Sequence, residues 1–326
     1  MRDGARVVTA RLTAPFPYFG AKSAIASRVW EAFGNPGNYV EPFFGSGAVL
    51  LSRPDVGRVE TANDACGFVP NAWRAISADP EAVASHADWP VSEADLHARH
   101  AWLVDRMTPA FVERLSSNHE YFDAKVAGIW IWGLSIWIGD GWCEGRIQVG
   151  TGIMRQGIGV NRQLPRLAGW TGTHVTYGAG VNTRERRDQL SEYFHALQAR
   201  LRHVRFACGD WSRVITESVT VSHGLTGVFL DPPYGEGARR KARLYAVDSL
   251  SVASDAARWA IEHGDDPRYR IVLCGYEGEH EMPANWRVVA WKSRSGYANA
   301  SRERLYLSPH CLGSDARPGP LFEAVS

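Results

Sequence analysis

One short stretch, residues 227–234 (Gly-Val-Phe-Leu-Asp-Pro-Pro-Tyr), constrains the fold of this chain more than any other. Its first four residues are apolar or small and predict a short buried strand. Pro232 and Pro233 have a fixed φ and no N–H, so regular structure must stop directly after Asp231. In an open α/β sheet, ligands bind outside the carboxyl ends of the strands. The stretch therefore predicts an α/β fold in which Asp231 lies where a substrate would bind.

The same residues predict a rigid clamp for a flat ring that carries an exocyclic amino group. Asp231 supplies a carboxylate, Pro232 a carbonyl acceptor and Tyr234 an aromatic face. The fixed φ of the two prolines holds these groups in one arc. We assign Asp231, Pro232, Pro233 and Tyr234 to the candidate catalytic site. A tight turn followed by a core tyrosine is the structural alternative.

A glycine turn near the amino terminus predicts a second part of the site. Residues 39–51 have the pattern strand, glycine turn, helix, and Gly45 and Gly47 would let a ligand approach the backbone closely. Asp64 ends the next expected strand, seventeen residues after Gly47, where a ribose-binding carboxylate belongs. The pair indicates an adenosine-containing cofactor. Leu50 stands where a dinucleotide site would need a third glycine, which counts against NAD.

The segment before the first expected helix contains a candidate anion site. Gly20 and Lys22 precede a helix whose first turn Ser23 would cap. Apolar residues follow from Ile25 onward, and the helix is expected to end at Gly34. A lysine at a helix start is placed to bind an anion, because the backbone N–H groups there point outward. A capped loop without a ligand is the alternative.

The composition limits the class of protein. A chain of 326 residues can bury one large core, or one core with an inserted subdomain. The net charge of +1 predicts no general attraction to polyanions, so any binding of nucleic acid would need local patches. Five cysteines without a C-x-x-C pair indicate reduced thiols in a cytoplasmic protein. No signal peptide is evident, and the most apolar run, residues 126–138, is too short to span a bilayer.

Residues 80–180 differ in character from the sequence on either side. Ser92 and Asp95 resemble a capping box, and helical patterns follow it. Seven of the thirteen tryptophans fall between residues 89 and 170, and residues 133–180 contain twelve glycines. We therefore expect an insertion that begins with helices and continues as short strands and loops.

Two groups of basic residues are candidates for contacting nucleic acid. In the insertion, arginines alternate with glutamine and asparagine, whose side chains read base edges, and with aromatic residues that can stack on bases. The second group is a basic run beside the clamp, which could neutralise phosphates, although most such runs face water. The candidates are Arg146, Arg155, Arg162, Arg239, Arg240 and Lys241. A solvated insertion that binds nothing is the alternative.

Helices and strands alternate again in the last part of the chain. Thr183 opens an amphipathic helix, and Asp210 follows a strand end, where it is a candidate for contacting the base of a cofactor. A further helix is expected around residues 254–262. The expected strands are residues 204–207, 270–274, 287–291 and 304–308.

Taken in order, these motifs resemble those of the Dam-like group of DNA adenine-N6 methyltransferases. Residues 18–22 look like that group's amino-terminal cofactor motif, and residues 40–47 are similar to its F-x-G-x-G loop. Asn63-Asp64 matches its ribose-binding acid, and Asp210 matches its acid near the cofactor's adenine. Residues 231–234 match its catalytic tetrapeptide, and residues 293–306 look like its carboxyl-terminal strand pair.

The chain departs from this family in two places. The usual Gly-Gly-Lys is Gly20-Ala21-Lys22 here. The middle region lacks the family's Asn-Gly and F-N-x-P-x-G pattern for recognising its target, and residues 139–142 read Gly-Asp-Gly-Trp instead. The recognition sequence therefore does not follow from the resemblance.

The resemblance implies a fold, a cofactor and partners. The fold would be a Rossmann-like methyltransferase sheet built from residues 1–79 and 181–326, with a mainly helical or irregular target-recognition subdomain inserted at residues 80–180. The cofactor would be S-adenosylmethionine (SAM), with Lys22 on its carboxylate and no metal. The residues that would bind SAM are Tyr18, Gly20, Lys22, Glu41, Phe43, Gly45, Gly47, Asp64 and Asp210. The partner would be double-stranded DNA with a flipped adenine, and a cognate restriction nuclease is a second candidate partner.

Two alternatives stay open. Methylation of N4 of cytosine, or of an amino group in RNA, uses the same clamp chemistry. A non-catalytic relative that only binds nucleic acid belongs to a different class. The presence of Asp231, Asp64, Gly45 and Gly47 together favours an enzyme, because drift would be expected to remove at least one of them.

Overall fold

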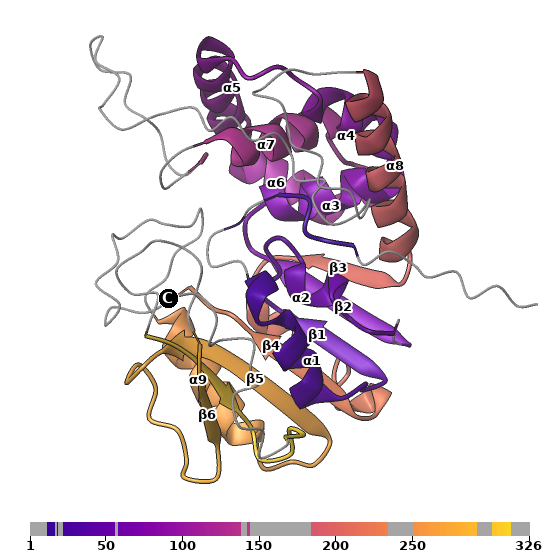
Figure 1. Cartoon of the computed structure of the whole chain (residues 1–326). Helices are drawn as coiled ribbons and strands as arrows, with labels where there is room; N and C mark the ends of the chain where they lie inside the picture. Colours follow the sequence, from indigo (N-terminus) through magenta and orange to yellow (C-terminus); the bar gives the residue numbers. More distant parts are fainter. Residues whose placement is uncertain are drawn as a thin grey trace, which may run out of the picture.

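The centre of the protein is a mixed seven-stranded sheet with the order β3-β2-β1-β4-β5-β7-β6 (Figure 1). A computed structural model describes residues 12–16, 18, 22–55, 58–137, 142–143, 184–233, 251–291 and 302–313. The strands are β1 Asn38–Glu41, β2 Val59–Asp64, β3 Val204–Cys208, β4 Thr226–Leu230, β5 Tyr269–Tyr276, β6 Arg287–Ala290 and β7 Glu303–Leu307. The predicted α/β class is confirmed, and the sheet is compatible with a Rossmann-like fold.

The order of the parallel strands reverses between β1 and β4. Strands β2 and β3 lie on one side of β1, whereas β4 and β5 lie on the other, and all five are parallel. Strand β7 runs antiparallel between β5 and β6. At such a switch point the loops that leave neighbouring carboxyl ends diverge and open a crevice. The predicted strand before Asp231 is β4, which is buried along its whole length.

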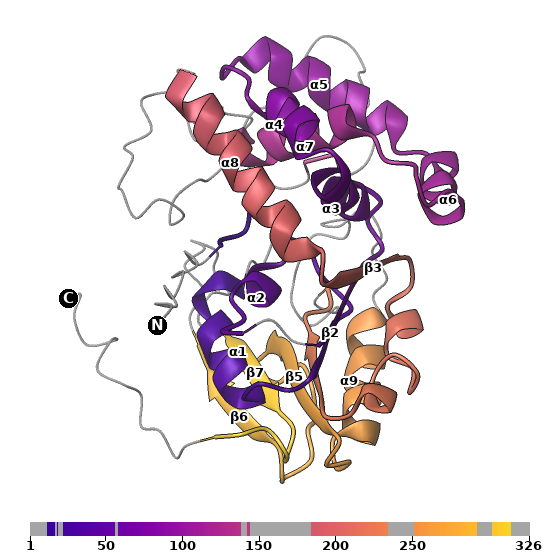
Figure 2. The same ribbon diagram turned by 90° about the vertical axis from the view of Figure 1, so that its right-hand side faces the viewer.

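Helices cover both faces of the sheet, because successive side chains of a strand point to opposite faces. In β4, Phe229 belongs to the core that includes α1 (Ala26–Phe33), whereas Val228 and Leu230 belong to the core that includes α9 (Val252–His263). Figure 2 shows α1 and α9 on opposite sides of the strands. The sheet is thus enclosed from both sides around its centre, as a parallel sheet requires.

Six described helices lie between β2 and β3 in the sequence and pack together beside the sheet (Figure 1). They are α3 Phe68–Ala78, α4 Pro80–Ala87, α5 Glu93–Arg106, α6 Pro109–Ser117, α7 Ala124–Ile136 and α8 Arg184–Leu201. The tryptophan-rich run is the interior of this layer, since residues 126–136 of α7 are all buried. None of the described helices is long and apolar enough to cross a membrane. The expectation of short strands and loops for residues 133–180 is wrong for residues 133–136, which continue α7 because their side chains are buried with the rest of that helix. Apart from residues 137, 142 and 143, the rest of that stretch lies outside the described residues.

Two expectations about helix ends are confirmed and one is wrong. Ser92 caps α5, because its Oγ accepts the backbone N–H of Asp95 at 3.2 Å. Gly34 ends α1 with a φ of 62°. Ser23, however, does not cap α1. It lies inside a 3-10 turn, η1 (Lys22–Ala24), whose Lys22 carbonyl accepts the N–H of Ile25 at 3.1 Å, so the chain enters α1 through a tighter turn.

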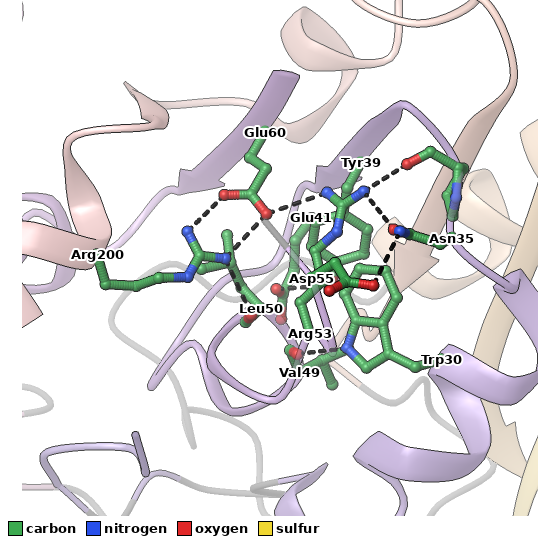
Figure 3. A network of polar contacts seen from close by, with 11 residues as sticks. Trp30, Asn35, Tyr39, Glu41, Val49, Leu50, Arg53, Asp55, Glu60 and Arg200 are labelled. Atoms are coloured by element: carbon green, nitrogen blue, oxygen red, sulfur yellow. Dashed lines mark hydrogen bonds and ion pairs between the residues drawn. The ribbon is translucent and has the colours of Figure 1, made fainter. Parts of the chain in front are cut away.

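A buried ion network joins β2 to the end of α8 and to the segment that contains Arg53 (Figure 3). Glu60 is fully buried, and its carboxylate lies 3.0 Å from Nη1 of Arg53 and 2.6 Å from Nη1 of Arg200. Arg200, near the end of α8, also donates to the carbonyl of Leu50 at 3.3 Å. Leu50 belongs to α2 (Ala48–Leu51), the short helix that follows the glycine turn. The network therefore attaches the glycine turn to β2 and to α8.

Replacing Glu60 with alanine is expected to destabilise the protein by about 3–5 kcal/mol, because Arg53 and Arg200 would keep buried charges without a counter-ion. Urea unfolding followed by circular dichroism measures the change. The control is Glu113→Ala on the exposed side of α6, where a change within about 0.5 kcal/mol is expected. Equal effects of the two substitutions would contradict the assignment.

Candidate active site

A cavity of about 360 Å³ lies at the carboxyl ends of β1, β2, β3 and β4. Its volume is in the range of sites for small organic ligands. The residues that line it and that the sequence assigned to cofactor binding or catalysis are Tyr18, Lys22, Glu41, Phe43, Gly45, Asp64, Asp210, Asp231 and Pro233. The topology therefore brings five separate segments of the chain together at the edge where ligands bind in open α/β sheets.

The glycine turn between β1 and α2 forms one wall of the cavity. Gly45 and Gly47 have φ values of 49° and 66°, which L residues with a side chain rarely adopt. A Cβ atom at Gly45 would lie 2.6 Å from the ring of Tyr18, and one at Gly47 would lie 2.6 Å from the ring of Phe44. Gly45 lines the cavity, whereas Gly47 lies outside its lining. The glycines thus allow the turn to pack against two aromatic rings.

Asp64 ends β2 and holds the glycine turn in place. Its Oδ2 accepts the N–H of Gly45 at 2.9 Å, and its Oδ1 accepts the N–H of Cys66 at 2.8 Å. Burial raises the pKa of Asp64 to about 6, although both backbone N–H groups favour the ionised form. The carboxyl group lines the cavity and can accept further hydrogen bonds there, since a carboxylate has about four acceptor positions.

Asn63 fixes the distance between three strand ends. Its Nδ2 donates to the carbonyl of Pro42 and to the carbonyl of Gly209, both at 3.0 Å. These carbonyls follow β1 and β3, so one buried amide connects both strands to β2. The sequence pointed to Asn63 only as the neighbour of Asp64, because nothing local indicates that Gly209 would lie close to it.

An aromatic pair and an acid form the wall after β3. Asp210 is exposed and accepts the N–H of Ser212 at 2.9 Å, which begins the 3-10 helix η2 (Trp211–Val214). Trp211 stacks on Phe43 with ring centres 5.8 Å apart and an angle of 27° between the planes. Both rings line the cavity. Sequence analysis missed Trp211, although its place directly after the acid at a strand end was an available signal.

Asp231 forms an ion pair with Lys22 on the cavity wall. The distance from Nζ of Lys22 to Oδ1 of Asp231 is 2.9 Å, and the side chains are 3% and 19% exposed. Burial raises the pKa of Asp231 above its ordinary value, and the ammonium of Lys22 reduces this rise. Burial alone would lower the pKa of Lys22, but the carboxylates of Asp231 and Glu303 raise it instead.

Glu41 adds a third carboxyl group at the end of β1. It is 3% exposed, and its Oε2 accepts the hydroxyl of Tyr39 at 2.8 Å. Burial raises the pKa of Glu41 well above its ordinary value, and the hydrogen bond from Tyr39 reduces the rise. The negative charge of Asp231 acts in the same direction as burial. Glu41 therefore holds a proton more readily than an ordinary glutamate.

The remaining candidates from the sequence do not line the cavity or lie outside the described residues. Pro232 is buried directly after Asp231, outside the lining of the cavity. The candidates outside the described residues are Gly20, Tyr234, Arg146, Arg155, Arg162, Arg239, Arg240 and Lys241. In the part of the chain that the structure describes, no cluster of three or more potential metal ligands occurs.

Comparison with known proteins gives no relative from which a function could be transferred. No protein-family model matches the chain, and a search of curated proteins finds no match.

The raised pKa of Asp64 makes its contribution to stability depend on pH. Between the ordinary value of 3.8 and the raised value of about 6, the folded protein holds a proton that the unfolded chain has lost. Stability relative to Asp64→Asn should therefore fall by up to about 3 kcal/mol as the pH rises through this interval. Urea unfolding of both proteins across the interval measures it. A constant difference between them would rule out this effect of burial.

Proposed function

We propose that this protein transfers the methyl group of SAM to the N6 amino group of adenine in DNA. One observation carries the proposal: Asp231, the glycine turn and Asp64 line a single cavity at the carboxyl ends of the strands. A clamp for an amino group at Asp231 and a site for an adenosine-containing cofactor at the glycine turn and Asp64 would then be adjacent, as a transfer between the two requires.

The chemistry of the cavity fits SAM better than a dinucleotide. Asp64, Asp210 and Asp231 outnumber Lys22 even when Glu41 is protonated, so the lining carries an excess of negative charge. Such a lining attracts a cationic ligand and repels a pyrophosphate. When bound, SAM supplies an electrophilic methyl group on a positively charged sulfur. Its adenosine portion would be held by residues that follow β2 and β3.

Each wall of the cavity has groups suited to one part of that ligand. Asp64 would accept hydrogen bonds from ribose hydroxyls, because its acceptor capacity exceeds the two backbone bonds it already has. Trp211 and Phe43 offer aromatic faces to an adenine ring, and Asp210 lies beside them to accept from its amino group.

The clamp would act by holding the target amino group and making its nitrogen more nucleophilic. The lone pair of an exocyclic amino nitrogen is delocalised into the ring. If the carboxylate of Asp231, which lines the cavity, accepts one N–H, and the carbonyl of Pro232, which lies directly after it and just outside the lining, accepts the other, the nitrogen becomes more pyramidal and its lone pair is localised. A flipped base would stack on Tyr234, and stacking contributes about 1–3 kcal/mol per base. That gain would offset part of the few kcal/mol needed to extrude the base.

The proposal is tested by incubating the protein with labelled SAM and either plasmid DNA or RNA in separate reactions, followed by nucleoside analysis by mass. N6-methyladenine is the expected product. Formation of N4-methylcytosine, or methylation of the RNA but not of the DNA, would show that the substrate is one of the alternatives and not adenine in DNA. Failure of SAM to bind in calorimetry would favour a non-catalytic protein.

Asp231→Asn is expected to lower methyl transfer by at least about 100-fold, because an amide accepts hydrogen bonds more weakly than a carboxylate and also presents a donor to the amino group. Binding of SAM should stay within a few-fold of the wild type. Asp105→Asn, on the exposed side of α5, is the matched control and should leave the rate unchanged. Full activity of Asp231→Asn would refute the role of the carboxylate.

Trp211→Ala is expected to weaken SAM binding by about 1–3 kcal/mol, because a stacking face beside Phe43 is lost. Calorimetry with SAM measures the change. Trp102→Ala, on α5 and away from the cavity lining, is the control and should leave the affinity unchanged. An unchanged affinity of the Trp211 variant would place the adenine elsewhere.

A further inference from the structure

Lys22 is an unusual lysine because almost none of its side chain reaches solvent. It is 3% exposed, whereas lysine side chains are rarely buried unless they are paired. Its Nζ lies 2.9 Å from Asp231 and 5.7 Å from the centre of the ring of Trp291, which is itself buried. The ammonium is thus fixed between a carboxylate and an aromatic face, and both contacts favour the charged form.

The surroundings of Asp231 disfavour its ionised form, so the contact with Lys22 has a large effect on its charge. Burial disfavours a negative charge on Asp231. The charge on Asp231 in turn favours the protonated form of Glu41 at the end of β1. Cys274 on β5 forms a hydrogen bond with Asp231 through its side chain. Glu303 on β7 interacts with Lys22 and with Cys274, and adds a further negative charge to the cluster. Lys22, on η1, supplies positive charge to this group of acids.

We propose that Lys22 is a positioning residue for Asp231, whose carboxylate it holds in a fixed orientation and in the ionised form. The inference rests on the proposed function, in which Asp231 must accept an N–H of the target amino group. A protonated carboxyl group would present a donor in place of part of this acceptor capacity. Lys22 then acts on the methyl acceptor through Asp231, whereas the sequence assigned it to the carboxylate of SAM.

The first test is an infrared titration of the unliganded protein, which does not depend on activity. The band of the protonated Asp231 carboxyl group is identified by its absence in Asp231→Asn. In Lys22→Met the midpoint of this band should move up by about one to three pH units, whereas Lys22→Arg should stay close to the wild type. Lys125→Met, an exposed lysine on α7, is the control and should leave the midpoint unchanged. An unchanged midpoint in Lys22→Met would overturn the proposal.

The second test separates Asp231 from SAM as the target of Lys22. The acid limb of the rate of methyl transfer at saturating SAM should move to higher pH in Lys22→Met, and Lys22→Arg should restore it. The affinity for SAM in calorimetry should change by less than about threefold, well under the factor of ten that corresponds to 1.4 kcal/mol. Loss of SAM affinity without a change in the acid limb would overturn the proposal and return Lys22 to the cofactor.

Two further outcomes are distinguishable. If the wild type transfers no methyl group, the proposed function fails, and the infrared midpoint alone decides the role of Lys22. If Lys22→Met does not fold, the double variant Lys22→Met/Asp231→Asn should restore folding, because the uncompensated carboxylate is then removed. A double variant that remains unfolded would overturn the charge coupling between the two residues.

Discussion

A charge that is taken out of water must be compensated inside the protein, and three acids within the sheet or at its carboxyl edge, one buried and two half-buried, are compensated in three different ways. Glu60 receives two guanidinium groups and is fixed structurally. Asp64 receives only two backbone N–H groups, so it retains acceptor capacity toward the cavity. Asp231 receives one ammonium and a hydrogen bond from the side chain of Cys274. Glu60, whose charge is compensated by two guanidinium groups, therefore stabilises the fold, whereas Asp64 and Asp231, with fewer partners, remain available to a ligand.

Local sequence signals predicted much of the fold and part of the site. The apolar run before Asp231 indicated β4, and the spacing of Gly45, Gly47 and Asp64 indicated the turn and the strand end that share one cavity wall. Such signals succeed because each depends on a few adjacent residues: a proline stops a strand, a glycine permits a positive φ, and Ser92 caps a helix. The ends of parallel strands then coincide by topology alone.

The features that sequence reasoning missed depend on residues far apart in the chain. The pairing of Lys22 with Asp231 and the stacking of Trp211 on Phe43 exist only after the sheet has formed. The same holds for the position of β7 between β5 and β6 and for the two arginines around Glu60. Ser23 was placed wrongly because a 3-10 turn, η1, precedes α1 and puts Ile25 at the cap position, which the local sequence did not indicate.

The contact of Arg200 with Glu60 and with the carbonyl of Leu50 has a consequence for evolution and protein engineering. The helices between β2 and β3 form a contiguous piece of sequence, and exchanging that piece between relatives would be a direct way to build chimaeras. The junction between this piece and the sheet imposes a requirement on the exchange, however. A transplanted module whose last helix lacks a cation at the position of Arg200 would leave Glu60 with Arg53 as its remaining partner and would remove the bond to the carbonyl of Leu50. The exchange of this piece is therefore constrained by a side chain at its very end, next to the last residue of α8.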